Sequence, residues 1–162
     1  MKIKDKISPI YVLLHDIRST HNVGSIFRTS DAIGVEKVYI SGYTPTPVDR
    51  FNRPRKDIAK VALGGEKSIP WEYITNPLTF IKKCKKEGME IVVLEQGVRS
   101  VDYKKFKQKG PILFIVGNEV DGVEGHLLDL ADTIVEISIN GDKESLNVSV
   151  AFGVALYRIS NI

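Results

Sequence analysis

Apolar and polar positions along the chain follow two periods, one typical of buried strands and one typical of helices. Predominantly apolar segments of strand length occur at 10–14, 35–41, 89–94, 112–116 and 133–139. Between the first two runs, Val23, Ile26 and Phe27 recur at the spacing of a helical face. Strands that alternate with helices in this way predict an α/β fold, with a sheet of five or six mainly parallel strands and helices on both faces.

Polar residues and glycines mark where the predicted helices begin and end. Asn22 is the predicted N-cap of the first helix, and Gly34 suits its last turn. Asn76 and Pro77 give a typical start to a second helix. The last helix begins near Leu146 and is apolar on nearly every face, so it is predicted to lie inside the domain or in a subunit interface.

The stretch from 42 to 70 is rich in proline, glycine and basic residues, and it is too long to be a simple connection. A short helix is predicted within it, near 54–62. Long loops in compact domains often carry function. The basic side chains that a polyanion could contact here include Arg50, Arg53, Arg55 and Lys56.

Length and composition set limits on the class of protein. A chain of 162 residues with 43% hydrophobic content suits one domain, and its single cysteine excludes an internal disulfide. The sequence contains no apolar run long enough for a membrane span and no export leader, so a cytoplasmic protein without membrane contact is expected. The net charge of +3 is too small to establish a nucleic-acid partner, and solvated helix faces explain the lysine groups equally well.

Familiar nucleotide and metal signatures are missing from the chain. It has neither a GxGxxG run after the first strand nor a GxxxxGK[ST] run. His15, His21, His126 and Cys84 show no metal-ligand spacing, so no metal site is predicted.

Three polar clusters remain, at 21–28, 117–122 and 145–149. Each has a structural explanation when taken alone, because Asn22 and Asn147 suit helix caps and glycines suit turns. The second cluster directly follows a predicted parallel strand and the third follows another, and ligands of open α/β sheets bind at the carboxyl ends of such strands.

Together and in this order, the clusters resemble the three motifs of the SpoU (TrmH-like) branch of the SPOUT RNA methyltransferases. The matching positions are Asn22, Gly24, Ile26 and Arg28, then Gly117, Glu119 and Gly122, then the run Ser-Leu-Asn-Val-Ser at 145–149. The resemblance covers about 9–160. The segment 139–144 is shorter than is usual in the family and lacks its proline. We expect a single domain, 1–162, without the N-terminal RNA-binding extension of many members.

This resemblance implies a C-terminal deep trefoil knot that holds S-adenosylmethionine, a homodimer, and tRNA or rRNA as substrate without a metal. The cofactor-binding residues that it implies are Leu94, Gly97, Gly117, Ile139 and Leu146. The catalytic residues that it implies are Arg28, Asn22, Glu119, Ser145 and Asn147. The RNA-binding residues expected beside them are Arg50, Arg53, Arg55 and Lys56.

The implied activity is methylation of a ribose 2'-oxygen, with Arg28 in the central role. Arg28 acts either as the base or as the group that stabilises the developing alkoxide, and an arginine pKa above about 12 favours the second role. Glu119 is expected to hold the Arg28 guanidinium in a bidentate pair. The alternatives are methylation of a base or of the tRNA wobble ribose by an enzyme of the same superfamily, and a non-catalytic RNA-binding protein.

The homodimer is expected to form through the last helix and the helix after the first strand. An apolar stripe on the last helix, which includes some of Phe152, Leu156 and Ile159, should then pack against the second copy of the chain.

Overall fold

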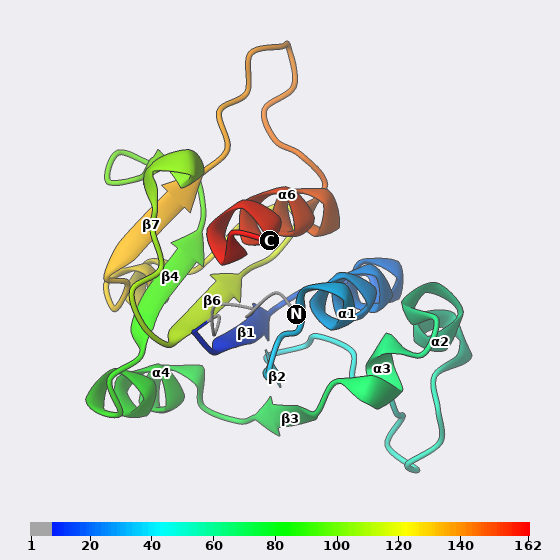
Figure 1. The fold of residues 1–162 in the computed structure, drawn as a ribbon. Helices are drawn as coiled ribbons and strands as arrows, with labels where there is room; N and C mark the ends of the chain where they lie inside the picture. Colours follow the sequence, from blue (N-terminus) through cyan, green and yellow to red (C-terminus); the bar gives the residue numbers. More distant parts are fainter. Residues whose placement is uncertain (1–7) are drawn as a thin grey trace, which may run out of the picture.

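The computed structural model describes residues 8–162, in which a parallel sheet separates two layers of helices (Figure 1). The strands are β1 (Ile10–His15), β2 (Lys37–Ser41), β3 (Trp71–Ile74), β4 (Glu90–Leu94), β5 (Val101–Asp102), β6 (Ile112–Val116) and β7 (Thr133–Glu136). The helices are α1 (Thr20–Ile33), α2 (Lys56–Ala62), α3 (Gly65–Ser68), α4 (Pro77–Lys86), the 3-10 turn η1 (Tyr103–Lys105), α5 (Gly125–Leu128) and α6 (Val148–Ser160). The predicted α/β fold is confirmed, and none of these helices is long and apolar enough to cross a bilayer.

The seven strands pair in the order β3-β2-β1-β6-β4-β7-β5, and every neighbouring pair is parallel. Strand β6 is buried along its whole length because helices cover both faces of the sheet, which explains its uninterrupted apolar sequence. The expected number of strands was too low. The missed strands β3 and β5 are short and partly exposed, so they carry no continuous apolar signal.

Strand β7 lies between β4 and β5, which follow one another along the chain. The segment 95–100 that joins β4 to β5 therefore has to pass across β7 or its end. After β7 the chain runs out as a long loop and returns to α6 (Figure 1). A chain that threads through a loop requires a crossing of this kind, and the trefoil knot itself stays a prediction.

Alternate residues of the strands point into two separate hydrophobic cores. Leu14 of β1 belongs to the core that contains Phe27 of α1 and Phe152 of α6. Leu13, its neighbour, belongs to the other core with Ile81 of α4 and Leu127 of α5. Helices α1 and α6 thus cover one face of the sheet, and α4 and α5 cover the opposite face.

Helix α1 begins earlier than predicted. Ser19 is its N-cap and accepts a hydrogen bond from the Asn22 backbone N–H at 3.1 Å, so the prediction that Asn22 is the cap is wrong. Gly34 ends the helix with φ at 85°, as expected of a C-terminal glycine. Gly24 faces α2, where an added Cβ would lie 2.7 Å from the Ile58 carbonyl oxygen, so the close packing of these helices requires glycine.

Helix α6 turns one apolar side to the core and leaves another exposed. Phe152, Leu156 and Ile159 are buried in the chain's own core, so the prediction that they form an uncovered stripe is wrong. Three other apolar side chains of α6, spaced four and three residues apart, keep exposed fractions between 42% and 51%: Val150, Val154 and Tyr157. This spacing places them on one helical face.

Candidate functional site

A pocket of about 300 Å³ lies at the carboxyl ends of β4, β6 and β7. Its walls come from the segment after β4, the turn after β6, the loop after β7 and the first turn of α6. The apolar part of the lining includes Leu94, Ile137, Ile139, Leu146 and Ala151. The pocket therefore occupies the position where ligands of parallel α/β sheets bind, as the sequence predicted.

The turn after β6 is built from glycines because the backbone doubles back on itself there. The Asn118 and Gly122 backbones exchange two hydrogen bonds of 3.0 Å. A Cβ on Gly117 would lie 2.5 Å from the Gly122 carbonyl oxygen. A Cβ on Gly122, whose φ is 69°, would collide with the Glu95 carboxylate. Side chains at either position would force this pocket wall apart.

Glu119, at the mouth of the pocket, holds the start of α1 in place. Its carboxylate accepts hydrogen bonds from the backbone N–H groups of Arg18 and Ser19, both at 3.1 Å, and from the Asn22 side-chain amide at 3.0 Å. Burial raises the pKa of Glu119, but these hydrogen bonds outweigh burial and bring the pKa below its ordinary value. Glu119 is therefore an ionised acceptor and a weak base.

A chain of side-chain hydrogen bonds joins the three sequence motifs. Asn22 donates to Glu119 through its amide nitrogen and accepts from the Asn147 amide at 3.1 Å through its oxygen. Asn147 is also the N-cap of α6, because its side-chain oxygen accepts from the backbone N–H groups of Ser149 and Val150. Asn147 thus does more than cap α6: together with Asn22 it fixes α1 and α6 relative to the pocket.

Arg28 lies apart from this network. It is an exposed residue of α1 and does not line the pocket. Within residues 8–162, Arg28 takes part in no ion pair, and the Glu119 carboxylate is occupied by the α1 N-terminus. The expected Arg28–Glu119 pair is therefore wrong for a single chain.

Most of the expected cofactor residues lie at the pocket. Leu94, Gly117, Ile139 and Leu146 line it, whereas Gly97 does not and has open space around its Cα. Ser145, the remaining candidate of the third motif, also belongs to the lining. Sequence reasoning missed four carboxylates of the lining: Glu95, Asp121, Glu136 and Glu144.

The pocket lining is acidic. Glu119 and the four missed carboxylates line the pocket, and no lysine or arginine among residues 8–162 does. Glu95 and Glu136 are held by protein donors, the first by the Val123 N–H at 3.0 Å and the second by the Ser100 hydroxyl at 2.6 Å. Such a lining favours a cationic ligand and repels phosphates.

The expected RNA-binding residues gather on the exposed segment before α2. Phe51 is 61% exposed, and the guanidinium groups of Arg50 and Arg53 lie 4.7 and 4.9 Å from its ring centre. Arg53 also pairs with Asp49 at 2.8 Å. Arg55 is the N-cap of α2 and Lys56 begins the helix. The segment therefore displays an aromatic ring flanked by positive charge.

The only cysteine is not a candidate nucleophile. Cys84 is a buried residue of α4, and burial raises the pKa of its thiol to about 11. A thiolate at this position is therefore scarce at neutral pH.

The parallel sheet, the glycine turn and the joined motifs agree with the SPOUT-type domain that the sequence resemblance implied. The model of the SpoU rRNA Methylase family matches residues 9–157, and the chain belongs to this family.

Curated relatives extend over nearly the whole chain. The 23S rRNA (guanosine-2'-O-)-methyltransferase RlmB of Ralstonia nicotianae is 31% identical over 153 residues, which cover 92% of this chain and 57% of the relative. The tRNA (guanosine(18)-2'-O)-methyltransferase of Aquifex aeolicus is 30% identical over 148 residues, which cover 91% of this chain and 67% of that enzyme. The chain thus spans little more than half the length of the first of these relatives.

Solved structures show the same fold. An AdoMet-bound rRNA methyltransferase from Sinorhizobium meliloti superposes with a TM-score of 0.85 at 27% identity, covering 96% of this chain and 57% of that one. The TrmH/SpoU tRNA modifying enzyme of A. aeolicus superposes with a TM-score of 0.83 at 28% identity, covering 95% of this chain and 75% of that one.

Proposed function

We propose that this chain transfers the methyl group of S-adenosylmethionine to a ribose 2'-oxygen of tRNA or rRNA. The observation that carries the proposal is the acidic pocket that the three joined motifs enclose at the carboxyl edge of the sheet. The names of the two curated relatives support a ribose 2'-oxygen of guanosine over a base as the acceptor. We also propose a cytoplasmic location, because tRNA and rRNA are the substrates proposed.

The residues of the pocket fit S-adenosylmethionine. This cofactor supplies a methyl group on a positively charged sulfonium. Asp121 and Glu144, which form no ion pair within residues 8–162, offset that charge, whereas they would repel the pyrophosphate of a dinucleotide. Leu94, Ile139 and Leu146 provide apolar walls for an adenine ring, and a volume of about 300 Å³ lies at the lower end of the usual range for small-molecule sites.

The residues of the three motifs position groups and do not act as a base. Glu119 is held ionised by three donors, and its lowered pKa makes it a poor proton acceptor. Glu119 fixes the turn before α1, and a hydrogen bond joins Asn22 of α1 to Asn147 at the start of α6. Alignment of the reacting groups lowers the activation barrier of a displacement reaction by several kcal/mol, on the order of 7 or more in the best cases.

Arg28 supplies the positive charge that the pocket lacks. A guanidinium stabilises a developing 2'-alkoxide or clamps a neighbouring phosphate, and both roles suit a group that stays protonated. Because Arg28 does not line the pocket of its own chain, it reaches the reacting ribose from a second copy.

A homodimer would bring Arg28 and the pocket together. Arg28 lies on α1, which packs beside α6 on the same face of the sheet: a Cβ on Gly153 of α6 would lie 3.7 Å from Thr29. The exposed stripe of α6 formed by Val150, Val154 and Tyr157 lies on that layer and offers an apolar interface. Pairing of two copies through α1 and α6 would place the Arg28 of each near the other's pocket.

Calorimetric titration with S-adenosylmethionine tests the proposed cofactor. We expect one site per chain in the presence of a chelator, and a large loss of affinity in Gly117→Ala, whose Cβ would collide with the Gly122 carbonyl. Gly125→Ala is the matched control, because no atom lies within 4 Å of its added Cβ. Tight NAD binding together with no response to S-adenosylmethionine would contradict the proposal.

A further inference from the structure

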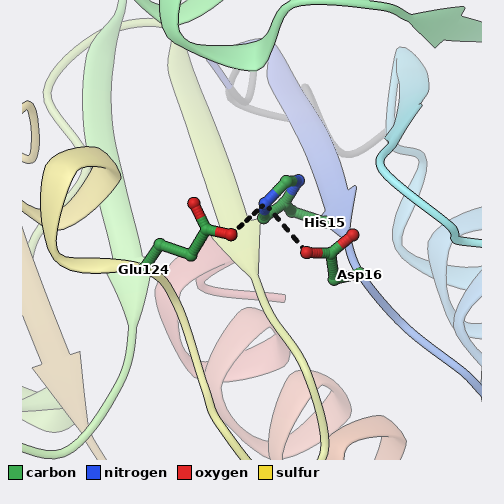
Figure 2. Close-up of side chains that lie close together, drawn as sticks. All are labelled: His15, Asp16 and Glu124. Atoms are coloured by element: carbon green, nitrogen blue, oxygen red, sulfur yellow. Dashed lines mark ion pairs between the residues drawn. The ribbon is translucent and has the colours of Figure 1, made fainter.

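A second cluster of ionisable side chains lies at the same edge of the sheet, outside the pocket. His15 ends β1, Asp16 follows it, and Glu124 comes from the segment that leads into α5 (Figure 2). The His15 Nε2 atom lies 3.3 Å from Asp16 Oδ2 and 3.8 Å from Glu124 Oε1. One atom from each of the three residues lies within 4.8 Å of the other two.

The His15 side chain is buried and aims an unpartnered atom into this cluster. The residue is 5% exposed, and its Nε2 atom has no hydrogen-bond partner within residues 8–162. Its other ring nitrogen, Nδ1, lies 2.8 Å from the Ser41 hydroxyl oxygen. If Nδ1–H donates to Ser41, Nε2 carries a lone pair that faces two carboxylates. In that tautomer three acceptors converge, and a cation between them would offset their mutual repulsion.

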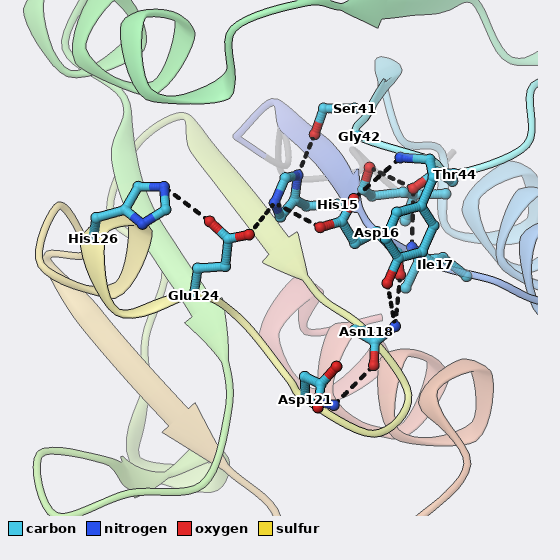
Figure 3. Close-up of polar contacts among 12 residues, drawn as sticks. His15, Asp16, Ile17, Ser41, Gly42, Thr44, Asn118, Asp121, Glu124 and His126 are labelled. Atoms are coloured by element: carbon cyan, nitrogen blue, oxygen red, sulfur yellow. Dashed lines mark hydrogen bonds and ion pairs between the residues drawn. The ribbon is translucent and has the colours of Figure 1, made fainter.

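Each carboxylate has one oxygen held by the protein and the other turned toward His15 (Figure 3). Asp16 Oδ1 accepts a hydrogen bond from the Tyr43 N–H at 3.1 Å, which leaves Oδ2 free. Glu124 Oε2 lies 2.9 Å from Nε2 of His126, which leaves Oε1 free. Within residues 8–162, no lysine or arginine pairs with either carboxylate.

We propose that His15, Asp16 and Glu124 bind a divalent transition-metal cation of the Zn²⁺ class. Zn²⁺ takes imidazole nitrogen and carboxylate oxygen at about 2.0–2.2 Å, so ligand atoms in a tetrahedral site lie about 3.3–3.6 Å apart. The His15–Asp16 distance of 3.3 Å meets this condition, and the half-exposed Glu124 closes the remaining gap by a small rotation. One imidazole in the set disfavours Mg²⁺, which prefers oxygen ligands.

The surrounding residues act as a supporting shell for this site. The Ser41 hydroxyl orients the His15 ring, as hydrogen-bond partners of metal-bound histidines do, and His126 orients Glu124. A water molecule completes the coordination, since Asp16 and Glu124 are partly exposed. No sequence motif indicates this site, because Glu124 is 109 and 108 positions away from its two partners (124 − 15 and 124 − 16).

The cation has a structural role. His15 shares its side of the sheet with Leu13, in the core beneath α4 and α5, whereas the pocket borders α6. The two sites are linked by Asn118, which lines the pocket and donates a hydrogen bond of 3.0 Å to the Asp16 carbonyl oxygen (Figure 3). A cation on Asp16 would therefore hold the end of β1 and the turn that carries Asn118.

Titration of the full chain with metal ions, after treatment with a chelator, tests this proposal. We expect one Zn²⁺ per chain in calorimetry, a rise in Tm with added Zn²⁺, and visible d–d absorption when Co²⁺ is used instead. Glu124→Gln should lose all three, and Ser41→Ala should bind Zn²⁺ about tenfold more weakly or worse. Asp129→Asn is the matched control: this exposed carboxylate pairs with Arg99 outside the cluster, so its binding should stay unchanged.

His15→Gln replaces a buried side chain and should also lose the metal, with circular dichroism to show that the variant is folded. Glu124, which is half exposed, tests the site without this risk to folding. A wild-type chain that takes up no Zn²⁺ overturns the proposal. Stoichiometric Zn²⁺ binding that persists in Glu124→Gln overturns the assignment to these residues, and equal affinity for Mg²⁺ overturns the assignment to the Zn²⁺ class.

Discussion

Single residues in this site act through partners that are distant in the sequence. Motif comparison named Asn22, Glu119 and Asn147, which hydrogen bonds join in the structure, but it misassigned two contacts. Ser19 caps α1 instead of Asn22, and Glu119 holds backbone N–H groups instead of a guanidinium. Sequence alone cannot predict such contacts, because the Asn22 partners lie 97 and 125 positions away and meet only in the folded sheet.

Glu119→Gln should destabilise the fold in a pH-dependent manner. The amide keeps the size of the side chain but loses the charge that three donors share, which costs about 1–2 kcal/mol for a partly buried group at neutral pH. The folded-state pKa of Glu119 is below its unfolded value, so its contribution is complete above the unfolded pKa near 4.5 and is lost as the pH falls through the folded pKa. Urea unfolding of both proteins at pH 7 and at acidic pH measures this difference.

The stability gap between the two proteins should be largest at neutral pH and should shrink below about pH 4.5. A gap that stays constant down to strongly acidic pH would show that the charge of Glu119 contributes nothing. Glu72→Gln is the control, because Glu72 is an exposed carboxylate whose partner is the Lys37 side chain at the sheet edge.

Arg28→Ala should abolish methyl transfer and leave S-adenosylmethionine affinity nearly unchanged. Arg28 is exposed and lies outside the pocket, so its loss removes charge from the RNA side of the reaction only. A loss of about 2.7–4 kcal/mol in transition-state stabilisation, or 100-fold to 1,000-fold in rate, is typical for one such donor. Single-turnover rates and calorimetry with the same variant separate the two effects.

Arg28→Lys tests the geometry of the guanidinium. Lysine keeps the charge but lacks the planar fork of donors, so it should restore only part of the rate. Near-normal turnover by Arg28→Ala would remove Arg28 from the mechanism.

At the scale of elements, the sequence predicted where helices lie better than which side they bury. The start of α4 at Asn76 and Pro77 agrees with the prediction, because cap residues act locally. The apolar sequence of α6 did not show which face of the helix is buried, since Val150 and Val154 are as hydrophobic as their buried neighbours. Only the position of α1 and the sheet decides that Phe152 and Leu156 face inward.

Val154→Glu should weaken the proposed homodimer and methyl transfer together. Val154 is 42% exposed on α6, so a carboxylate there remains solvated in the single chain but faces apolar residues in a dimer. Sedimentation at micromolar concentration should give about twice the chain mass of 18.1 kDa for the wild type and a lower mass for the variant.

Val98→Glu is the control for association, because Val98 is fully exposed on the loop after β4. Leu156→Glu is not a useful test, because Leu156 is completely buried and a charge there would unfold the chain. A fully active wild-type monomer would contradict the dimer.

The exposed segment before α2 should bind RNA through two separable effects. Replacing Arg50 and Arg53 together with alanine should weaken binding and reduce the slope of log affinity against log salt by about 2, roughly one per lost phosphate contact. Phe51→Ala should weaken binding by about 1–3 kcal/mol, as expected for a stacked base, with little change in slope. Filter binding over a range of salt concentrations distinguishes the two.

Lys37→Ala is the control and should change neither the RNA affinity nor its salt slope. Lys37 lies at the start of β2, at the opposite end of that strand from the chain that leads to α2, and it pairs with Glu72. An unchanged slope in the double variant would mean that Arg50 and Arg53 do not contact phosphates.

At the scale of the whole molecule, strand alternation predicted a parallel α/β sheet but not its order. Strands β3 and β5 lie at the two edges of the sheet and are too short and too exposed to show an apolar run. The insertion of β7 between β4 and β5 is a long-range feature that no local pattern records. The same crossing gathers the segments after β4, β6 and β7 around one pocket, which is why the acidic lining was missed.

Transfer of a labelled methyl group tests the central claim most directly. The full chain is incubated with methyl-labelled S-adenosylmethionine and unmodified tRNA or rRNA, and the RNA is digested to nucleosides for mass spectrometry. We predict that the label appears in a 2'-O-methylnucleoside and that the phosphodiester next to it resists alkaline cleavage. Label found only on a base, or no label on any RNA despite bound S-adenosylmethionine, would contradict the account.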